Sequence, residues 1–473
     1  MPMNSWGLNL NPKASTQFKK LLSIKNINRV YEEEVSWKNI RGIDRLSVYQ
    51  FEKNKDAHFK VIRDKCLNSS YNFSPYLEKL RTKGRNRAPR VISLASIRDR
   101  IVLAIIKNYL HDIFPESVNR TLPNTYVNKI KKFYQTTDFT DIFIYKVDIH
   151  QFYDSIQHQT LLKTLSSKIQ NKPELNLIKK AIENPTVSSD FRKTSLKELK
   201  NDNGVPQGLA ISNILANIYL QKLDEAVKAK SLLYIRYVDD IFIAVRASHE
   251  KRLKSQTRYW LSKLGLETNK DKTKWVPIEA EIDYLGYHFN LPTVSVKQGT
   301  IDKYIKRLSA LFSVYANIGP EAVYKNVKID VGKQLFISDV NEKITGAISE
   351  NKRYGWIFYF LEMTDLTLLY NIDRLVRDKF CARIKKRKWK PDFSKIKSIA
   401  KSYYDAKYDP LGGYIENYDD YNSIAKKTKF LAHWGVINSD ENVTHTANQI
   451  ERMFKQFIRK RLADLEADLT EAS

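Results

Sequence analysis

The stretch "YIRYVDDIFIAV", residues 234–245, places Asp239 and Asp240 side by side in a run that is otherwise mostly apolar and aromatic. The β-branched and aromatic residues on both sides predict two β-strands flanking the pair. Burying one carboxylate is costly, and burying two neighbours costs more, so the pair needs either solvent or a compensating partner. A solvent-exposed tight turn between two strands would meet this need, because Asp is common in turns.

A third acid offers a different explanation. Asp148 lies in "YKVDIHQFYDSI" (145–156), where it also ends an apolar strand, and two such strands can lie side by side in one sheet. Three converging carboxylates form a site for hard cations such as Mg²⁺, which prefers oxygen ligands. Two such ions about 4 Å apart can activate a hydroxyl and stabilise a leaving pyrophosphate. The acids would then be metal ligands rather than unpaired buried charges.

The charge of the chain indicates what such a site acts on. The 473 residues include 80 Lys and Arg against 53 Asp and Glu, a net charge of +27, and the basic residues are spread along the whole sequence. This surplus favours a polyanionic partner, most simply nucleic acid. A basic solubilising surface and attachment to an anionic membrane are the alternatives.

Cysteine usage and hydropathy suggest a location. The chain has two cysteines, Cys66 and Cys381, and no CxxC pair, which argues against a structural zinc knuckle and suits a reducing compartment. No run approaches the roughly 18 apolar residues of a membrane span, and the N-terminal stretch does not resemble a signal peptide. We therefore expect a cytoplasmic protein with no membrane attachment.

Apolar spacing predicts the main elements along the chain. The predicted elements are helices over most of 1–140, a strand at 141–149, helices over 157–200, a loop at 201–208 opening an amphipathic helix, a helix at 249–264, a turn and strand at 264–275, a hairpin at 282–290, and basic helices from about 300 to 390.

These segments resemble the motifs of reverse transcriptases. "RYVDDIFI" resembles the YxDD box of that family, and "VDIHQFYDSI" resembles its motif A. Five further segments resemble other family motifs, and all seven occur in family order between about residues 40 and 290. They are "GIDRLSVYQF" (42–51), "APRVISLASIRDRIVLAII" (88–106), "NGVPQGLAISNILANIYL" (203–220, motif B), "LGLETNKDKTKW" (264–275, motif D) and "DYLGY" (283–287, motif E).

The resemblance implies an α+β fold, a right-hand polymerase with fingers, an antiparallel-sheet palm and a helical thumb, followed by an α-helical C-terminal extension. The implied domains are fingers and palm over 1–290, a basic, maturase-like thumb over 291–395, and the extension over 396–473. The implied activity is RNA-directed DNA polymerisation with two Mg²⁺ ions, for which Mn²⁺ could substitute.

The catalytic roles follow from the matched positions. Asp148 and Asp239 match the metal ligands, Asp240 matches the second acid of the box, and Ile149 stands where the family uses a backbone carbonyl as a further ligand. Lys272 matches a motif D lysine that protonates the leaving pyrophosphate. The neighbouring lysines 270 and 274 remain alternatives, because motif D is short.

Nucleotide-binding roles are implied in the same way. Tyr153 matches an aromatic steric gate that blocks a ribose 2′-hydroxyl and so selects deoxynucleotides; an ordinary core aromatic is the alternative. Gln207 and Gly208 match the motif B turn, where Gly lets the backbone approach the base pair. The family often has Pro at the positions of Ala210 and Asn213, a difference we expect to alter loop stiffness more than chemistry.

Basic residues of the fingers are candidate triphosphate ligands. Arg90 is favoured, followed by Lys83, with Arg98 as a further candidate; Arg90 and Lys83 could instead contact template phosphates. Arg100 is expected to be structural.

The segment 353–390 resembles, more loosely, the thumb of group II intron proteins. Arg387, Lys388 and Trp389 could grip a duplex or a structured RNA, with a solvated basic face as the alternative. Six tyrosines between 403 and 421 are expected mainly to pack, although a tyrosine hydroxyl could also serve as a primer.

Among reverse transcriptases, the pattern looks most like the free-standing abortive-infection and defence-associated enzymes. We therefore expect a non-coding RNA template, dNTP substrates and a DNA product, with a homo-oligomer left open. A maturase or RNA-binding protein, template-independent synthesis and a retron enzyme are the alternatives.

Overall fold

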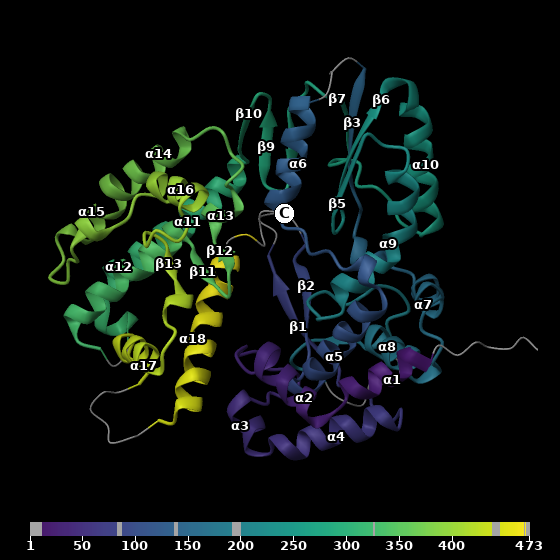
Figure 1. Cartoon of the computed structure of the whole chain (residues 1–473), viewed down its shortest axis with the longest axis horizontal. Helices are drawn as coiled ribbons and strands as arrows, with labels where there is room; N and C mark the ends of the chain where they lie inside the picture. The colour runs from purple at the N-terminus through teal and green to yellow at the C-terminus, as the bar shows by residue number, and fades with distance from the viewer. Residues whose placement is uncertain are drawn as a thin grey trace, which may run out of the picture. The chain divides into compact units, whose positions relative to one another are not determined.

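The structure is a computed structural model that describes residues 12–82, 88–136, 141–191, 200–324, 327–437, 445–467 and 469 (Figure 1). Contacts divide the chain into two units. Unit 1 contains residues 1–120 and 140–278, and unit 2 contains residues 121–139 and 279–473. The three-domain division at residues 290 and 395 stays a prediction beside this two-unit division.

The strands predicted around the three aspartates form one antiparallel sheet in unit 1. Its order is β5-β6-β3-β7. The strands are β3 (Ile142–Asp148), β5 (Leu233–Tyr237), β6 (Asp240–Arg246) and β7 (Lys274–Pro277). Buried residues lie on both faces of β3, Ile142 and Ile144 on one and Tyr145 and Val147 on the other, so this strand is covered on both sides. This sheet confirms the antiparallel palm and brings Asp148 beside the 239–240 pair.

A second sheet in unit 1 was missed by the sequence analysis, which predicted mostly helix up to residue 140 and helices over 157–200. It contains β1 (Tyr76–Arg81), β2 (Arg90–Leu94) and the short β4 (Thr186–Val187). Pro75 and Pro89 directly precede β1 and β2. Proline restricts the residue before it to extended conformations and interrupts helices, which is the local signal that was overlooked.

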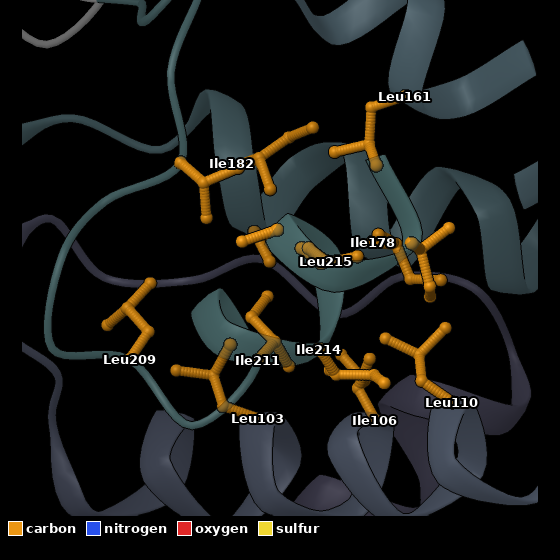
Figure 2. Packing of buried hydrophobic residues seen from close by; sticks show 14 of the residues in the cluster. Leu103, Ile106, Leu110, Leu161, Ile178, Ile182, Leu209, Ile211, Ile214 and Leu215 are labelled. Carbon is orange, nitrogen blue, oxygen red and sulfur yellow. The ribbon is translucent and has the colours of Figure 1, made fainter. Parts of the chain in front are cut away.

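Helices cover the rest of unit 1. They are α1 (Pro12–Leu21), α2 (Ile24–Val30), α3 (Val48–Lys53), α4 (Lys55–Leu67), α5 (Ile97–Ile113), α7 (His158–Ser166), α8 (Lys172–Glu183), α9 (Ser212–Lys228) and α10 (Glu250–Lys263). Figure 2 shows aliphatic side chains of α5, α8 and α9 meeting in one core. Ile106, Ile178, Ile211 and Leu215 are each at most 1% exposed. This core fixes α9 and therefore the loop that precedes it.

Asp99 and Arg100, in the first turn of α5, both have structural roles. Arg100 donates hydrogen bonds to the backbone carbonyls of Val35 and Ile40 at 2.6 and 2.9 Å. The buried Asp99 accepts hydrogen bonds from the Tyr71 hydroxyl and from Ser96 Oγ, both at 2.7 Å. Arg100 therefore ties α5 to residues 35–40, in agreement with the structural role expected for it.

Unit 2 is mainly helical. Its helices are α6 (Pro123–Thr136), α11 (Gln298–Val323), α12 (Ile329–Thr345), α13 (Trp356–Tyr359), α14 (Thr367–Leu375), α15 (Ala382–Lys385), α16 (Ile399–Tyr408), α17 (Ile424–His433) and α18 (Ala447–Ala467). Its strands are β8 (Ile282–Tyr284), β9 (Tyr287–Asn290), β10 (Thr293–Val296), β11 (Ala347–Ser349), β12 (Lys352–Tyr354) and β13 (Glu416–Asn417).

The hairpin predicted at 282–290 is present as β8 and β9, joined by Leu285 and Gly286 with φ values of 49° and 76°. The prediction of helical structure from about 300 to 390 is wrong at β11 and β12. Gly346 and Gly355, both with positive φ, bracket this second hairpin. Glycine tolerates such φ values, so these two residues were the available signal.

The C-terminal part of the chain is folded and α-helical, as predicted. A cluster of buried side chains joins α17, α18 and β11. At its edge Arg461 contacts Glu342 and Asp339, the latter at 2.9 Å, and its guanidinium lies 3.9 Å from the centre of the Trp434 ring. Burial without partners would be prohibitive for these charges, so the ion pairs fix α18 against α12.

Among the described residues, no helix combines the length and the apolar character that crossing a membrane requires. Cys66 and Cys381 are both buried free thiols, and burial raises the pKa of each above its usual value.

Candidate active site

The two adjacent aspartates lie at a two-residue turn. Tyr237 of β5 pairs with Asp240 of β6, so Val238 and Asp239 form the connection. Val238 has a φ of 59°, which is uncommon for any non-glycine residue and strained for a β-branched one. Asp240 also lies directly opposite Asp148 across the β3–β6 ladder. Opposed residues in an antiparallel pair have Cβ atoms about 5 Å apart, so the three carboxylates converge on one end of the sheet.

A residue that the sequence analysis did not single out holds this turn. Arg236 donates to the Val238 carbonyl at 2.9 Å and to both carboxylate oxygens of Asp224 on α9, at 2.7 and 2.6 Å. It also donates to Asn217 Oδ1 at 2.9 Å. A bidentate Arg–carboxylate pair has a fixed geometry, so α9 dictates where the turn lies. Arg236 precedes the YxDD segment and is evident in the sequence, but its pairing with Asp224, 12 residues earlier, could not be predicted.

The environment of the acids opposes their ionisation. Burial raises the pKa of Asp239 above its usual value, and the charge of Asp148 raises it further. Burial, with the two other acids, raises the pKa of Asp240 to about 7, although Lys146 Nζ lies 3.7 Å from Asp240 Oδ1 and opposes the shift. The side chains are therefore not the solvent-exposed pair that a plain turn would present. Carboxylates crowded in this way are stabilised by positive charge.

Part of that positive charge comes from Lys272, which follows α10 and precedes β7. Its Nζ lies 3.1 and 3.3 Å from the two carboxylate oxygens of Asp148. The Lys272 side chain is 56% exposed and the Asp148 side chain 15%, so the lysine approaches the acid from solvent. Of the three lysines considered in this segment, Lys272 is the one that contacts Asp148.

The donor set suits Mg²⁺, because three carboxylates supply the hard oxygen ligands that this ion prefers. Among the described residues, no three His, Cys, Asp or Glu side chains are arranged to enclose a metal ion as they stand. Because the Lys272 ammonium group contacts both carboxylate oxygens of Asp148, it would have to release this acid for a cation to bind there. Ile149, the predicted carbonyl ligand, lies next to Asp148, has a buried side chain and forms a β-bridge with Thr268.

The loop before α9 is closed on itself and anchored at both ends. Ser212 Oγ donates to the Pro206 carbonyl at 2.6 Å, and His158 Nε2 lies 2.6 Å from the Gly204 carbonyl oxygen. The predicted residues Gln207 and Gly208 lie between these anchors. The Gln207 carbonyl accepts a hydrogen bond from the Ser93 amide of β2 at 2.7 Å. Sequence reasoning missed His158, because its contact is to a carbonyl 46 residues away.

Gly208 makes the closest approach in this loop. Its φ is 98°, and a Cβ at this position would lie 2.7 Å from Ile92 Cγ2 and 3.3 Å from the Ser93 carbonyl oxygen. The close packing of Gly208 against β2 is therefore enough to require glycine at this position. The approach of Gly208 to a base pair stays a prediction.

Tyr153 lies on a single 3-10 turn after β3, η3 (Phe152–Ser155), and its hydroxyl donates to Asn213 Oδ1 at 2.8 Å. Burial, together with the charge of Asp239, raises the pKa of Tyr153, and Arg90 acts in the opposite direction. Asp239 and Arg90 thus lie within electrostatic range of this ring. Arg90 is the exposed first residue of β2, and the structure places it on the side of the acids.

Other predicted residues belong to unit 2 or lie outside the described part of the chain. Lys83 lies outside the described residues. Arg387 and Lys388 are exposed in unit 2. Trp389, expected to be available for stacking, packs instead against Gly319, and its Nε1 is buried. The Trp389 ring already packs inside unit 2, so stacking on nucleic acid would require it to leave this position.

Comparisons with known proteins match the part of the chain that contains this site. Residues 81–289 match the family described as reverse transcriptase (RNA-dependent DNA polymerase). The chain is 24% identical over 283 residues to an uncharacterised 91 kDa protein in the cob intron of Schizosaccharomyces pombe, covering 46% of this chain and 34% of that protein. It is 22% identical over 295 residues to Protein YkfC of Escherichia coli, covering 52% of this chain and 74% of that protein.

The chain thus spans about a third of the length of the fission yeast protein. A solved structure of telomerase from Candida albicans, in complex with a fragment of telomeric RNA, matches with 14% identity and a TM-score of 0.40, covering 89% of this chain and 68% of that one. The matched family segment contains Asp148, Asp239, Asp240 and the loop before α9. Residues 81–289 are therefore a reverse transcriptase domain.

Proposed function

We propose that the protein is an RNA-directed DNA polymerase that adds dNTPs to a 3′-hydroxyl with the help of two Mg²⁺ ions. The observation that carries the proposal is the pairing of Asp148 on β3 with Asp240 on β6, with Asp239 directly before Asp240 in the turn that joins β5 to β6. Such an arrangement concentrates negative charge at one point of a rigid sheet. A structural turn gains nothing from that concentration, whereas a cation site depends on it.

The reaction joins the 3′-oxygen of a primer to the α-phosphorus of a dNTP, breaks the bond to pyrophosphate and releases the 3′-hydroxyl proton. Bound Mg²⁺ would supply the charge that activates the hydroxyl and stabilises the leaving group. Asp148, Asp239 and Asp240 are the residues that would hold it. The sheet and Arg236 orient these carboxylates before substrate arrives.

Lys272 would supply the proton that pyrophosphate takes up as it leaves. Its contact with Asp148 places its ammonium group near the candidate site, and its exposed side chain leaves it free to turn towards a triphosphate when a cation displaces it from Asp148. Arg90, exposed and within electrostatic range of Asp239, would bind triphosphate oxygens.

Primer extension on a defined RNA template with Mg²⁺ and dNTPs tests the proposal. We expect wild-type protein to extend the primer to a product complementary to the template. The Asp239→Ala/Asp240→Ala variant should lose extension while keeping its thermal unfolding temperature, because removal of two crowded acids relieves repulsion. Equal extension by both proteins would refute the assignment of the acids.

We extend the proposal, on the motif resemblance, to a structured non-coding RNA template and a role in cytoplasmic defence against phage. Sequencing RNA that co-purifies with the protein identifies the template. Plaque counts on cells carrying wild type or the Asp239→Ala/Asp240→Ala variant test the defence role, which predicts protection by wild type alone. A DNA product unrelated in sequence to the bound RNA would instead indicate template-independent synthesis.

An RNA-binding or maturase function is the second candidate. The observation that favours it is the exposed basic run 385–388 in unit 2, where Lys385, Lys386, Arg387 and Lys388 are all exposed. Each phosphate contact made by such residues steepens the salt dependence of binding. RNA binding or splicing assistance that survives loss of the acids would favour this candidate.

A further inference from the structure

Asn213 bonds directly to the candidate gate residue. The hydroxyl of Tyr153 donates to Asn213 Oδ1 at 2.8 Å, although the two residues are 60 positions apart. Asn213 is exposed and lies in the first turn of α9, whose core-facing side chains fix the helix. The acceptor therefore lies on a rigid element, and the phenol end of Tyr153 is tied to it.

The backbone of Tyr153 is held by the loop that precedes α9. The Val205 amide donates to the Tyr153 carbonyl at 2.8 Å, and a Cβ on Gly204 would lie 3.3 Å from that carbonyl oxygen. Val205 and Asn213 thus hold Tyr153, one at its backbone carbonyl and one at its hydroxyl. Fixing both ends leaves the ring little freedom to rotate, which is the property that a steric filter requires.

We propose that Asn213 is a positioning residue for nucleotide selection, whose carboxamide oxygen holds the Tyr153 ring where it excludes nucleotides that carry a 2′-hydroxyl. This inference rests on the proposed polymerase function. A ring held only by packing can swing aside to admit one extra oxygen atom, whereas a ring bonded at its tip must first break that hydrogen bond. Selection against ribonucleotides therefore depends on the bond as well as on the ring.

The departure of Asn213 from the Pro that reverse transcriptases often have here gains a specific meaning. Proline has no side-chain acceptor, so it cannot make this bond with a tyrosine hydroxyl. In this chain the helix start supplies a carboxamide where a hydroxyl needs a partner. We expected the difference to affect loop stiffness more than chemistry, and the contact with Tyr153 gives it a chemical role instead.

The test is a double-mutant cycle on Tyr153→Phe and Asn213→Ala, using poly(rA) primed with oligo(dT) as the substrate. The measured quantity is the ratio of kcat/KM for dTTP to that for UTP. Each single variant should lower this ratio by about 2- to 10-fold, the range expected for one hydrogen bond. The double variant should lower it no further than either single variant, because both remove the same bond.

Asn213→Pro should behave like Asn213→Ala. The exposed Asn422, in unit 2, supplies the matched control Asn422→Ala, which should leave the ratio unchanged. Thermal unfolding should show that all variants are folded. A wild-type ratio in Asn213→Ala, or an effect that adds to that of Tyr153→Phe, would overturn the inference.

Failure of the proposed function is recognised separately, as an absence of dTTP incorporation by wild type. The inference is then judged on equilibrium binding of dTTP and UTP to the protein on the same primer–template with Ca²⁺. A Kd ratio that both single variants reduce to the same degree supports the role of Asn213. A ratio unaffected by Asn213→Ala refutes it.

Discussion

Arg236 donates a hydrogen bond of 2.9 Å to the carbonyl oxygen of Val238, the residue directly before Asp239. The same guanidinium holds Asp224 through both carboxylate oxygens, and Tyr234 donates to Asp224 Oδ1 at 2.6 Å. A strained turn that carries two acids is thereby fastened to α9. The contacts of Arg236 with Val238 and Asp224 therefore set the position of Asp239 and Asp240.

Replacing Arg236 by Ala should therefore reduce both stability and activity. The pair with Asp224 is largely buried, with 10% exposure on the Arg side, so breaking it should cost about 3 kcal/mol in urea unfolding. Arg236→Lys keeps the charge but not the planar fork, and should lower kcat on the order of 10- to 100-fold by displacing the turn.

The exposed pair Arg29–Glu33, with side chains 51% and 48% exposed, is the control for charge removal. Arg29→Ala should change stability by less than about 0.5 kcal/mol. Full kcat in a folded Arg236→Lys variant would show that the turn is held by other means.

Gly208→Ala should disable the loop before α9. The added methyl group would lie 2.7 Å from Ile92 Cγ2 at a φ of 98°, so loop or strand must shift, at an expected cost of about 1–3 kcal/mol. Gly299→Ala is the matched change, because nothing lies within 4 Å of its Cβ position on α11. It should be neutral or stabilising by up to about 1 kcal/mol. Primer extension and thermal unfolding of the two variants decide the comparison.

Asp99 should make the protein less stable as the pH rises. Burial raises the pKa of Asp99 from 3.8 to about 6, against the opposing effects of its hydrogen bonds and of Arg98. The folded chain therefore holds this proton more tightly than the unfolded chain. Its contribution is complete below pH 3.8 and is lost as the pH passes through about 6.

Asp99→Asn removes this titration and can keep the geometry. Its oxygen can accept from Ser96 Oγ and from the Ser74 amide, while its amide group can donate to the Tyr71 hydroxyl, which can rotate. Relative to wild type, the variant should gain stability between pH 4 and 6 in urea unfolding. Parallel pH profiles for the two proteins would contradict the assignment.

Arg461→Ala should loosen the C-terminal helix. The substitution leaves the buried Glu342 with Tyr418 as a remaining partner and removes the contact with Asp339, at an expected cost of about 3–5 kcal/mol. Lys455→Ala, on the same helix, breaks only an exposed pair with Glu451 and should cost less than about 1 kcal/mol. Hydrogen exchange along α18 measures both, and similar protection in the two variants would exclude a fastening role for Arg461.

The site residues that could be predicted from the sequence are those whose side-chain chemistry is compatible with few functional roles. Two adjacent acids between apolar strands, and a third at the end of another apolar strand, have few explanations, so Asp148, Asp239 and Asp240 were identified together. A close backbone approach at Gly208 was expected from the motif B resemblance, but its positive φ and its contact with β2 come from the structure alone. The palm strands followed from their continuous β-branched and aromatic composition.

The unpredicted features depend on which distant side chains meet. Asn213 reads as an ordinary helix-start residue until Tyr153 is placed beside it, and Arg236 reads as one cation among 80 Lys and Arg residues. Trp389 looked available for stacking because sequence does not show that Gly319 leaves space for its ring. Periodicity reports which face of an element is apolar, but not what that face contacts.

Single-residue loss of the opposed carboxylate is the most direct measurement of the central claim. Asp148→Asn keeps shape while removing the charge that faces Asp240 across the sheet, and Asp190→Asn makes the same change at an exposed loop position. Single-turnover primer extension on an RNA template, at saturating dNTP and Mg²⁺, should fall by at least about 100-fold in Asp148→Asn and stay at the wild-type rate in Asp190→Asn. Extension at the wild-type rate by a folded Asp148→Asn variant would contradict the account.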